Sequence, residues 1–186
     1  MKVDISKGWK QYTAWMDKEP NPKYKAMIHN MRLHHKYECL VDPAIFDTMV
    51  PEPEYEFFTG GEPTILKGMD AVQSFYYGNW EAGASLVDLD VHRLACNDWG
   101  AACDGEFYQQ IPGSSLVAQG RDVPDANAHY LTHTRMSWFF PYEEIDGEMK
   151  LGGEICYIDT SDTSLVQIDD KDVLTLEDAR ANWVDT

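Results

Sequence analysis

The fold is decided by residues 24–80, YKAMIHNMRLHHKYECLVDPAIFDTMVPEPEYEFFTGGEPTILKGMDAVQSFYYGNW. From Tyr24 to Asp42, apolar and histidine side chains recur at three- and four-residue steps, which predicts one long helix. Pro43 and Pro51 interrupt this period, so the helix should end before them. The rest of the stretch predicts a strand at 55–58, a turn at Gly60-Gly61, a short returning strand at 63–66 and a second helix at 70–77.

On either side of this stretch, the chain predicts one further helix and a set of long strands. Residues 1–20 form an amphipathic helix whose aromatic stripe includes Trp9, Tyr12 and Trp15. Alternating patterns predict strands at 84–96, 101–111, 129–142 and 149–159. We expect a loop at 112–127, which could act as a lid, and a tail at 160–186 with a short capped helix. The length suits a single domain spanning 1–186, to which the N-terminal helix 1–20 and the tail are additions.

The order of these elements resembles a known superfamily. A long helix, then VDPAIFDTMVPEPEYEFF (41–58), LKGMDAVQSFYY (66–77) and long strands, resembles the NTF2-like superfamily, in its SnoaL-like and scytalone-dehydratase-like branch. The resemblance implies an α+β fold, an NTF2-like cone of N-terminal helices packed on a curved antiparallel sheet. It also implies a homo-oligomer, through dimerisation by the sheet. The superfamily holds dehydratases, isomerases, cyclases, hydrolases and non-catalytic proteins, so fold alone leaves function open.

Composition excludes several classes of partner. The net charge of −17 opposes binding to nucleic acid and to anionic membranes. Apolar runs are short, and the N-terminus has no pattern of a secretory signal. The four cysteines have no zinc-site spacing, which favours reduced core thiols in a cytoplasmic protein. His34 and Glu38 are one helical turn apart but lack a third ligand, so we expect no metal site.

Four residues are candidates for catalysis, chiefly from the resemblance. Asp42 matches a catalytic acid near the end of the first long helix, although an Asp before proline is also a common helix-end residue. His92, in DVHRLACND, matches a strand histidine that serves as base or donor. His133 and Arg135 alternate on one strand face, which is either the pocket or a solvated face. Alternation alone does not tell which face is concave.

Four more residues are candidates for holding the substrate. Tyr37 and Tyr55 are close in sequence to the expected cavity wall, and tyrosines of related dehydratases bind a substrate carbonyl or a bridging water. Tyr108 on the neighbouring strand could reach the same site. His35 and His34 point about 100° apart on the helix, so at most one of them faces the cavity. Each tyrosine could equally be a core residue with its hydroxyl at the edge.

The function expected from these patterns is a lyase that needs no cofactor. The chain has no phosphate-binding glycine loop, dinucleotide fingerprint or nucleophile elbow, so proton transfer is the chemistry left. We expect dehydration or formaldehyde release on a small apolar or aromatic substrate. The closer resemblance, to lyases of lignin-derived diaryl compounds, implies the same. The alternatives are a hydrolase or isomerase of the same fold, for example on an epoxide, or a non-catalytic ligand-binding dimer.

Overall fold

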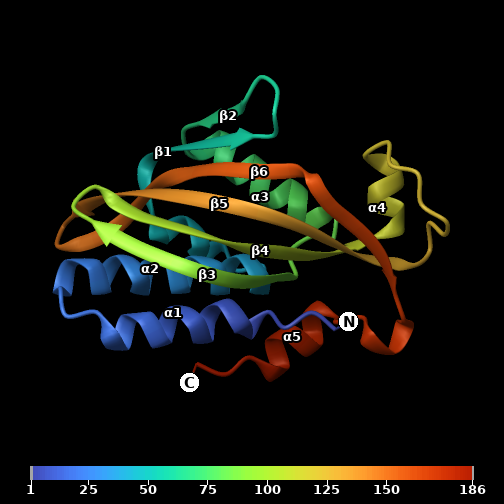
Figure 1. The fold of residues 1–186 in the computed structure, drawn as a ribbon, viewed down its shortest axis with the longest axis horizontal. Helices are drawn as coiled ribbons and strands as arrows, with labels where there is room; N and C mark the ends of the chain where they lie inside the picture. The colour runs from blue at the N-terminus through green and yellow to red at the C-terminus, as the bar shows by residue number, and fades with distance from the viewer. Residues whose placement is uncertain (1, 186) are drawn as a thin grey trace.

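The structure, a computed structural model, describes residues 2–185 apart from the side chain of Asp162, so both ends of the expected domain 1–186 lie outside the described residues. The chain forms one sheet with helices along it (Figure 1). In chain order the elements are α1 (Ser6–Lys18), α2 (Pro22–Leu40), the 3₁₀ helix η1 (Pro43–Thr48), β1 (Met49–Phe58), β2 (Thr64–Lys67), α3 (Met69–Glu81), β3 (Val87–Asn97), β4 (Gly100–Pro112), α4 (Gly113–Ala118), β5 (His129–Ile145), β6 (Glu148–Ile168), η2 (Asp170–Asp172) and α5 (Leu176–Asn182).

The two N-terminal helices form where the sequence predicts them. Asn21 caps α2 by accepting a hydrogen bond from the Lys23 backbone N–H at 3.0 Å, and Pro22 occupies the first turn. Val41 then ends the helix in the left-handed conformation, with φ of 55°. The helices lie side by side beneath the sheet (Figure 1). This pairing places α2 between α1 and the concave face of the sheet.

The sheet is mixed, with strand order β2-β1-β6-β5-β4-β3. Every neighbouring pair is antiparallel except β1 and β6, which run parallel. The α+β cone is therefore confirmed, and the one parallel pair is a feature that the expected antiparallel sheet lacked. Pro51 and Pro53 lie inside β1, where its register with β6 shifts between Met49 and Glu54. A strand tolerates proline at such an irregularity because ladder hydrogen bonds are already missing there.

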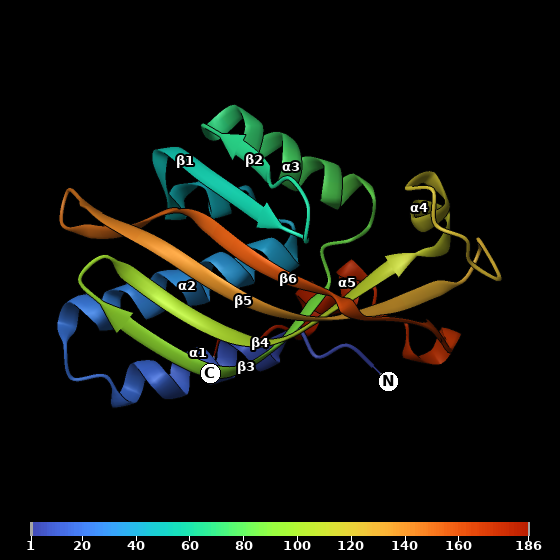
Figure 2. The same cartoon turned by 45° about the horizontal axis from the view of Figure 1, so that its top comes forward.

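Curvature of the long strands makes the space in which the site forms. The pairings of β5 with β6 and of β3 with β4 contain register shifts, which bend strands and raise their twist. Figure 2 shows α2 crossing the hollow of the bent sheet, and α3 beside β1 and β2. The main core fills this hollow with side chains from α2 and the concave face, among them Met27, Ile28, Met31, Met136, Trp138 and Phe140.

The structure corrects two boundaries. Within the expected loop 112–127 a short helix forms, α4, because Leu116 packs into a satellite core with Ile111 and Tyr130. Strand β6 continues through Ile168, so the beginning of the expected tail 160–186 pairs with β5. The tail helix α5 is capped as expected, by Thr175. None of the described helices combines the length and the apolar character that a membrane crossing requires.

Candidate active site

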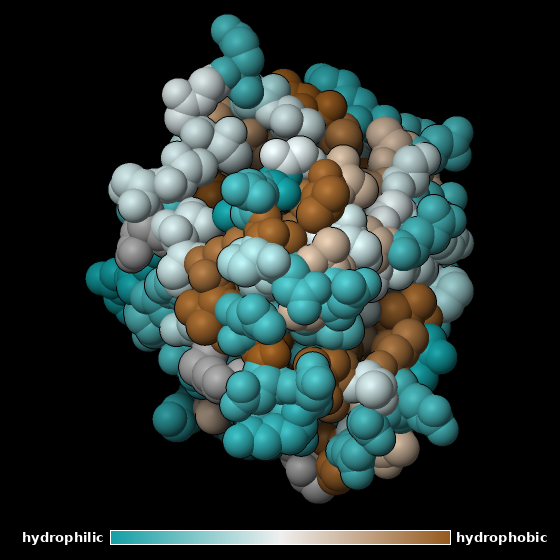
Figure 3. All heavy atoms as spheres, turned by 90° about the vertical axis from the view of Figure 1, so that its right-hand side faces the viewer, coloured by the Kyte–Doolittle hydropathy of each residue, from teal (hydrophilic) through white to brown (hydrophobic). Residues whose placement is uncertain are grey.

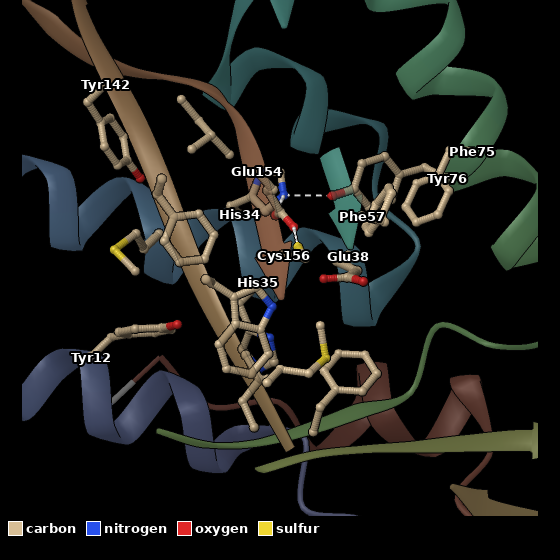
Figure 4. Close-up of a pocket in the computed structure, with 17 residues that line it drawn as sticks. Tyr12, His34, His35, Glu38, Phe57, Phe75, Tyr76, Tyr142, Glu154 and Cys156 are labelled. Atoms are coloured by element: carbon tan, nitrogen blue, oxygen red, sulfur yellow. Dashed lines mark hydrogen bonds and ion pairs between the residues drawn. The ribbon is translucent and has the colours of Figure 1, made fainter. Parts of the chain in front are cut away.

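A cavity of about 100 Å³ lies between α2, α3 and the concave face of the sheet (Figure 4). Its wall is mostly aromatic and aliphatic, but it also holds two carboxyl groups, two imidazoles and three phenols. The lining residues are Tyr12, Met31, His34, His35, Glu38, Phe57, Phe75, Tyr76, Leu89, Phe107, Met136, Trp138, Phe140, Tyr142, Leu151, Glu154 and Cys156. An apolar pocket with a few convergent polar groups is the usual form of a small-molecule site.

Hydrogen bonds fix the tautomer of His34. The Thr48 hydroxyl donates to the Ile45 carbonyl at 2.5 Å, so its oxygen must accept from His34 Nδ1, which lies 2.8 Å away. Nδ1 therefore carries a proton, and Nε2 presents its lone pair in the neutral ring. Both His34 and Thr48 are buried, which holds this arrangement in one orientation. The imidazole is thus prepared to accept a proton at Nε2.

Three groups surround His34 Nε2. The Tyr76 hydroxyl is 2.8 Å away, and the Tyr55 hydroxyl is 3.4 Å from the same nitrogen and 3.1 Å from Tyr76. A carboxylate oxygen of Glu154 lies 3.4 Å from Nε2. The Glu154 carboxylate therefore lies where it would stabilise a proton taken up at His34 Nε2. Burial raises the pKa of both phenols well above the ordinary value, so they stay protonated.

Glu38 supplies a group that can donate a proton, in contrast to His34 Nε2, which can accept one. Its carboxyl faces the cavity from α2 and has no hydrogen-bond partner among the described side chains. Burial, and then the negative charge of Glu154, raise the pKa of Glu38 from 4.5 to about 8. The carboxyl is therefore mostly neutral at pH 7 and can donate a proton. The cavity combines a neutral acid with a proton-accepting pair.

Local geometry explains how the chain brings these groups together. His34 and Glu38 are four residues apart on α2, so they lie on one face of the helix, one turn from each other. Glu154 and Cys156 share a face of β6 because side chains alternate along a strand, and the Glu154 carboxylate accepts a weak hydrogen bond from the Cys156 thiol. Gly153 has φ of 148° and lies against the Glu54 backbone, which lets β1 approach β6 beside the site.

His35 also lines the cavity, in agreement with the expectation that it faces the site, but His34 lines it too. Its Nε2 donates to the Ile5 carbonyl at 3.1 Å, and burial lowers its pKa to about 4. His35 therefore stays neutral and holds the segment before α1 against α2. The expectation that at most one of the two histidines reaches the cavity is wrong, because side chains from two adjacent sides of α2 line this cavity.

The three strand residues predicted to be catalytic, His92, His133 and Arg135, lie outside the cavity. Arg135 bridges Asp104 at 2.7 Å and Glu106 at 2.5 Å. His133 contacts the same Glu106 at 2.7 Å, and His92 Nδ1 accepts from Arg135 at 3.0 Å. Their alternation did place them on one face, as predicted. That face is the convex one, because Met136, Trp138 and Phe140 occupy the concave side of β5.

The remaining predicted residues have different placements. Asp42 caps η1, accepting from the Ala44 N–H at 3.0 Å, and does not line the cavity. Tyr37 lines a separate groove between α2 and the β5–β6 turn. Tyr108 lies on the convex face, stacked on His133 with ring centroids 4.7 Å apart. Tyr55 is fully buried behind Tyr76, so it contacts the site through a hydroxyl rather than lining it.

Sequence reasoning missed Glu154 and Tyr76 as cavity residues, and it missed the raised pKa of Glu38. A signal existed in β6, where Glu154 alternates with Cys156 on an otherwise apolar strand face. The spacing of His34 and Glu38 was noticed, but only as a possible metal site. Among residues 2–185, no group of three or more His, Cys, Asp or Glu side chains is arranged to hold a metal ion. All four cysteines are free.

Comparisons with known proteins bear on the fold. No family model and no curated protein matches the chain. Among solved structures, a protein of Jannaschia sp. CCS1 assigned as a SnoaL-like polyketide cyclase has a TM-score of 0.54 at 12% identity, over 76% of this chain and 90% of that one. One from Shewanella putrefaciens CN-32 with the same assignment gives 0.53 at 9% identity, over 87% and 91%.

A third structure, from Novosphingobium aromaticivorans, is assigned as an aromatic ring hydroxylase. It matches with a TM-score of 0.52 at 14% identity, over 87% of this chain and 99% of that one. All three identities are low, so the likeness is one of fold and does not transfer an activity. The helices around a bent sheet and these neighbours together show that the chain shares the fold of the SnoaL-like structures.

Proposed function

We propose that the protein is an enzyme, a lyase that performs general acid–base elimination on a small aromatic substrate without a cofactor. One observation carries the proposal: a neutral Glu38 and the His34–Glu154 pair face a single apolar cavity. A neutral carboxylic acid held in one apolar cavity with proton-accepting groups is typical of acid–base enzymes. Such positioned groups contribute about 10² to 10⁴ each in rate.

In a dehydration, the His34–Glu154 pair removes a proton from a carbon next to a carbinol. The electron pair of the broken C–H bond forms the new C=C bond, and the C–O bond breaks with its pair on oxygen. The proton of Glu38 joins the departing hydroxide, so water leaves. The proton on the His34–Glu154 pair then returns to the Glu38 carboxylate, which restores the enzyme. Tyr76 donates a hydrogen bond within the cavity and orients either the base or a substrate oxygen.

Formaldehyde release uses the same two groups. Here the base takes the hydroxyl proton of a hydroxymethyl substituent, and the C–C bond to that carbon breaks. Its electron pair forms the C=C bond while the neighbouring carbinol oxygen leaves as water with the proton from Glu38. A lignin-derived diaryl compound with adjacent carbinol and hydroxymethyl groups fits this scheme. The aromatic wall of Phe57, Phe75 and Phe107 suits rings of that kind.

We propose a homo-oligomer that forms through the convex face of the sheet. This face carries an apolar groove of about 550 Å³, where Trp99 and Tyr157 are 46% and 49% exposed. Phe58 stacks on Tyr157 with centroids 4.7 Å apart, which extends the aromatic surface. Exposed patches of this kind often mark a protein interface. Free thiols suit a reducing compartment, and we propose that the protein is cytoplasmic.

The test is turnover of a panel of phenolic alcohols, without added metal or nucleotide, by the wild type and the variants Glu38→Gln and His34→Asn. We expect each substitution to lower kcat by about 10² or more, because each removes one proton-transfer group. The control is Glu62→Gln, in the exposed turn between β1 and β2. Full activity in both cavity variants would contradict the mechanism, and inactivity in variants of His92 or His133 would return the chemistry to the convex face.

Labelled solvent oxygen distinguishes the alternative reactions. An elimination incorporates none of the label, because the oxygen that leaves comes from the substrate. A hydrolase of the same fold, acting for example on an epoxide, would place the label in its product. A non-catalytic binding protein would bind aromatic ligands with these variants as tightly as with the wild type, and would turn over none of the panel.

A further inference from the structure

The acid–base cavity adjoins a larger hollow. A second hollow, of about 350 Å³, shares five lining residues with it: Glu38, Phe57, Phe75, Phe107 and Met136. The two spaces therefore adjoin each other at these five side chains, and we call the second the vestibule. Because the inner part is small, a substrate larger than a single ring must extend into the vestibule.

The vestibule is lined in a different way from the inner cavity. Its lining includes four polar residues that the inner cavity lacks: Asn79 of α3, Gln119 and Arg121 after α4, and Thr134 of β5. The structure shows no side-chain hydrogen bond or ion pair for any of these four described residues. Figure 3, which faces the end of the molecule that carries α4, shows hydrophobic surface enclosed between hydrophilic side chains. The vestibule thus combines apolar walls with unpaired polar groups.

Arg121 is the only cation among the described residues that line either space. The chain has a net charge of −17, with 15 Lys and Arg against 32 Asp and Glu, so carboxylates are abundant partners for any arginine. Arg93 and Arg135, for example, each pair with Asp104 on the convex face. An arginine left unpaired in such a protein, at the mouth of an apolar site, is available for an anion from outside.

Hydrogen bonds of a helix C-terminus fix the backbone of Arg121, whose side chain is exposed. Gly120, with φ of 79°, ends α4, and its N–H bonds the Val117 carbonyl at 2.9 Å. The Arg121 N–H bonds the Leu116 carbonyl at 2.9 Å, which completes a Schellman motif. Leu116 is buried, so the motif is anchored to the sheet. The backbone of Arg121 therefore has a defined position beside the vestibule, which its side chain lines.

We propose that the substrate is a monoanionic aromatic compound whose carboxylate binds Arg121, with Gln119 as a second donor, while the reacting end lies in the inner cavity. The guanidinium presents paired N–H donors that match a carboxylate. The strong negative charge of the protein repels polyanions, so a single carboxylate is the anion that a single arginine accommodates. This inference rests on the proposed function, because it takes the inner cavity to be the reacting end.

Binding of two probes of matched shape tests the proposal. The probes are 3-phenylpropionate and its neutral amide, 3-phenylpropanamide, and their dissociation constants are measured by calorimetry or by quenching of tryptophan fluorescence. We expect the wild type to bind the carboxylate about three- to tenfold more tightly than the amide. Arg121→Gln should abolish the preference without changing amide affinity, and Arg121→Lys should keep part of it. At an ionic strength of about 1 M the preference should shrink, because charges then screen within about 3 Å.

The matched control is Arg93→Gln, which removes an exposed arginine from the convex face and should leave the preference intact. Equal affinity for both probes in the wild type, no binding of the carboxylate, or an unchanged preference in Arg121→Gln would each overturn the proposal. Binding is measured without turnover, and repeating it in Glu38→Gln separates the two claims. A carboxylate preference kept by a fully active Glu38→Gln protein would refute the acid role of Glu38 and leave the anion site standing.

Discussion

Glu38→Gln should stabilise the protein at neutral pH while it impairs the proposed chemistry. Burial raises the pKa of Glu38 from 4.5 to about 8, so the folded protein keeps a proton there that the unfolded chain releases above pH 4.5. Stability from this site is therefore full below pH 4.5 and is lost as the pH rises towards 8. Integrated from pH 4.5 to pH 7, the loss is about 3 kcal/mol in the free energy of unfolding. Glutamine carries no titrating proton and avoids this loss.

Urea unfolding, followed by tryptophan fluorescence at pH 5, 6, 7 and 8, measures this difference. We expect the free energy of unfolding of the wild type to fall relative to Glu38→Gln by about 1.4 kcal/mol per pH unit between roughly pH 5 and 7.5. The control Glu62→Gln, at an exposed turn, should follow the wild type at every pH. Parallel pH profiles for the wild type and Glu38→Gln would refute the neutral acid in the cavity.

Three further substitutions test other parts of the site. Thr48→Val leaves the buried His34 Nδ1–H without an acceptor, which should lower the free energy of unfolding in urea by about 1 to 3 kcal/mol. The same change should lower kcat, because the tautomer of His34 is no longer fixed. An unchanged kcat would show that the tautomer is irrelevant. His133→Gln removes a partly exposed hydrogen bond to Glu106 worth about 1 kcal/mol or less, so the kinetics should match the wild type. An inactive enzyme would place the chemistry on the convex face. Gly153→Ala puts a Cβ against the Glu54 backbone and should lower the free energy of unfolding by about 3 kcal/mol or prevent folding. A melting curve like that of the wild type would contradict the close approach of β1 and β6.

The helices and strands were predictable from the sequence because their determinants are local and periodic, whereas their arrangement as a cone was implied by the resemblance. The long helix, the caps at Asn21 and Thr175, and the alternating strands all rest on patterns within a few residues. Helix α4 was not predictable in this way, because its formation depends on Leu116 packing against Ile111 and Tyr130 of the two flanking strands, a tertiary contact that no periodic pattern reveals. The parallel pairing of β1 with β6 likewise depends on residues a hundred positions apart in the chain.

The site was predictable only in part, because a pattern of alternation has no absolute direction. It grouped His133 with Arg135 correctly, but the concave face of β5 belongs to Met136 and its neighbours. Asp42 and Tyr37 were assigned to the site by their position in a family pattern. In the structure Asp42 caps η1, and Tyr37 lines a separate groove. Glu38 acquires its character from burial in the folded protein, which no spacing in the sequence reveals.

The protonation state of Glu38 is the most direct test of the proposed mechanism. In protein labelled with ¹³C at glutamate side-chain carboxyls, the signal absent from Glu38→Gln identifies this residue, and its chemical shift is followed from pH 4 to pH 10. We predict a titration midpoint of about 8, so that a neutral acid faces the cavity at pH 7. A midpoint close to 4.5 would mean that Glu38 is a carboxylate at neutral pH, and the proposed acid–base pair would not exist.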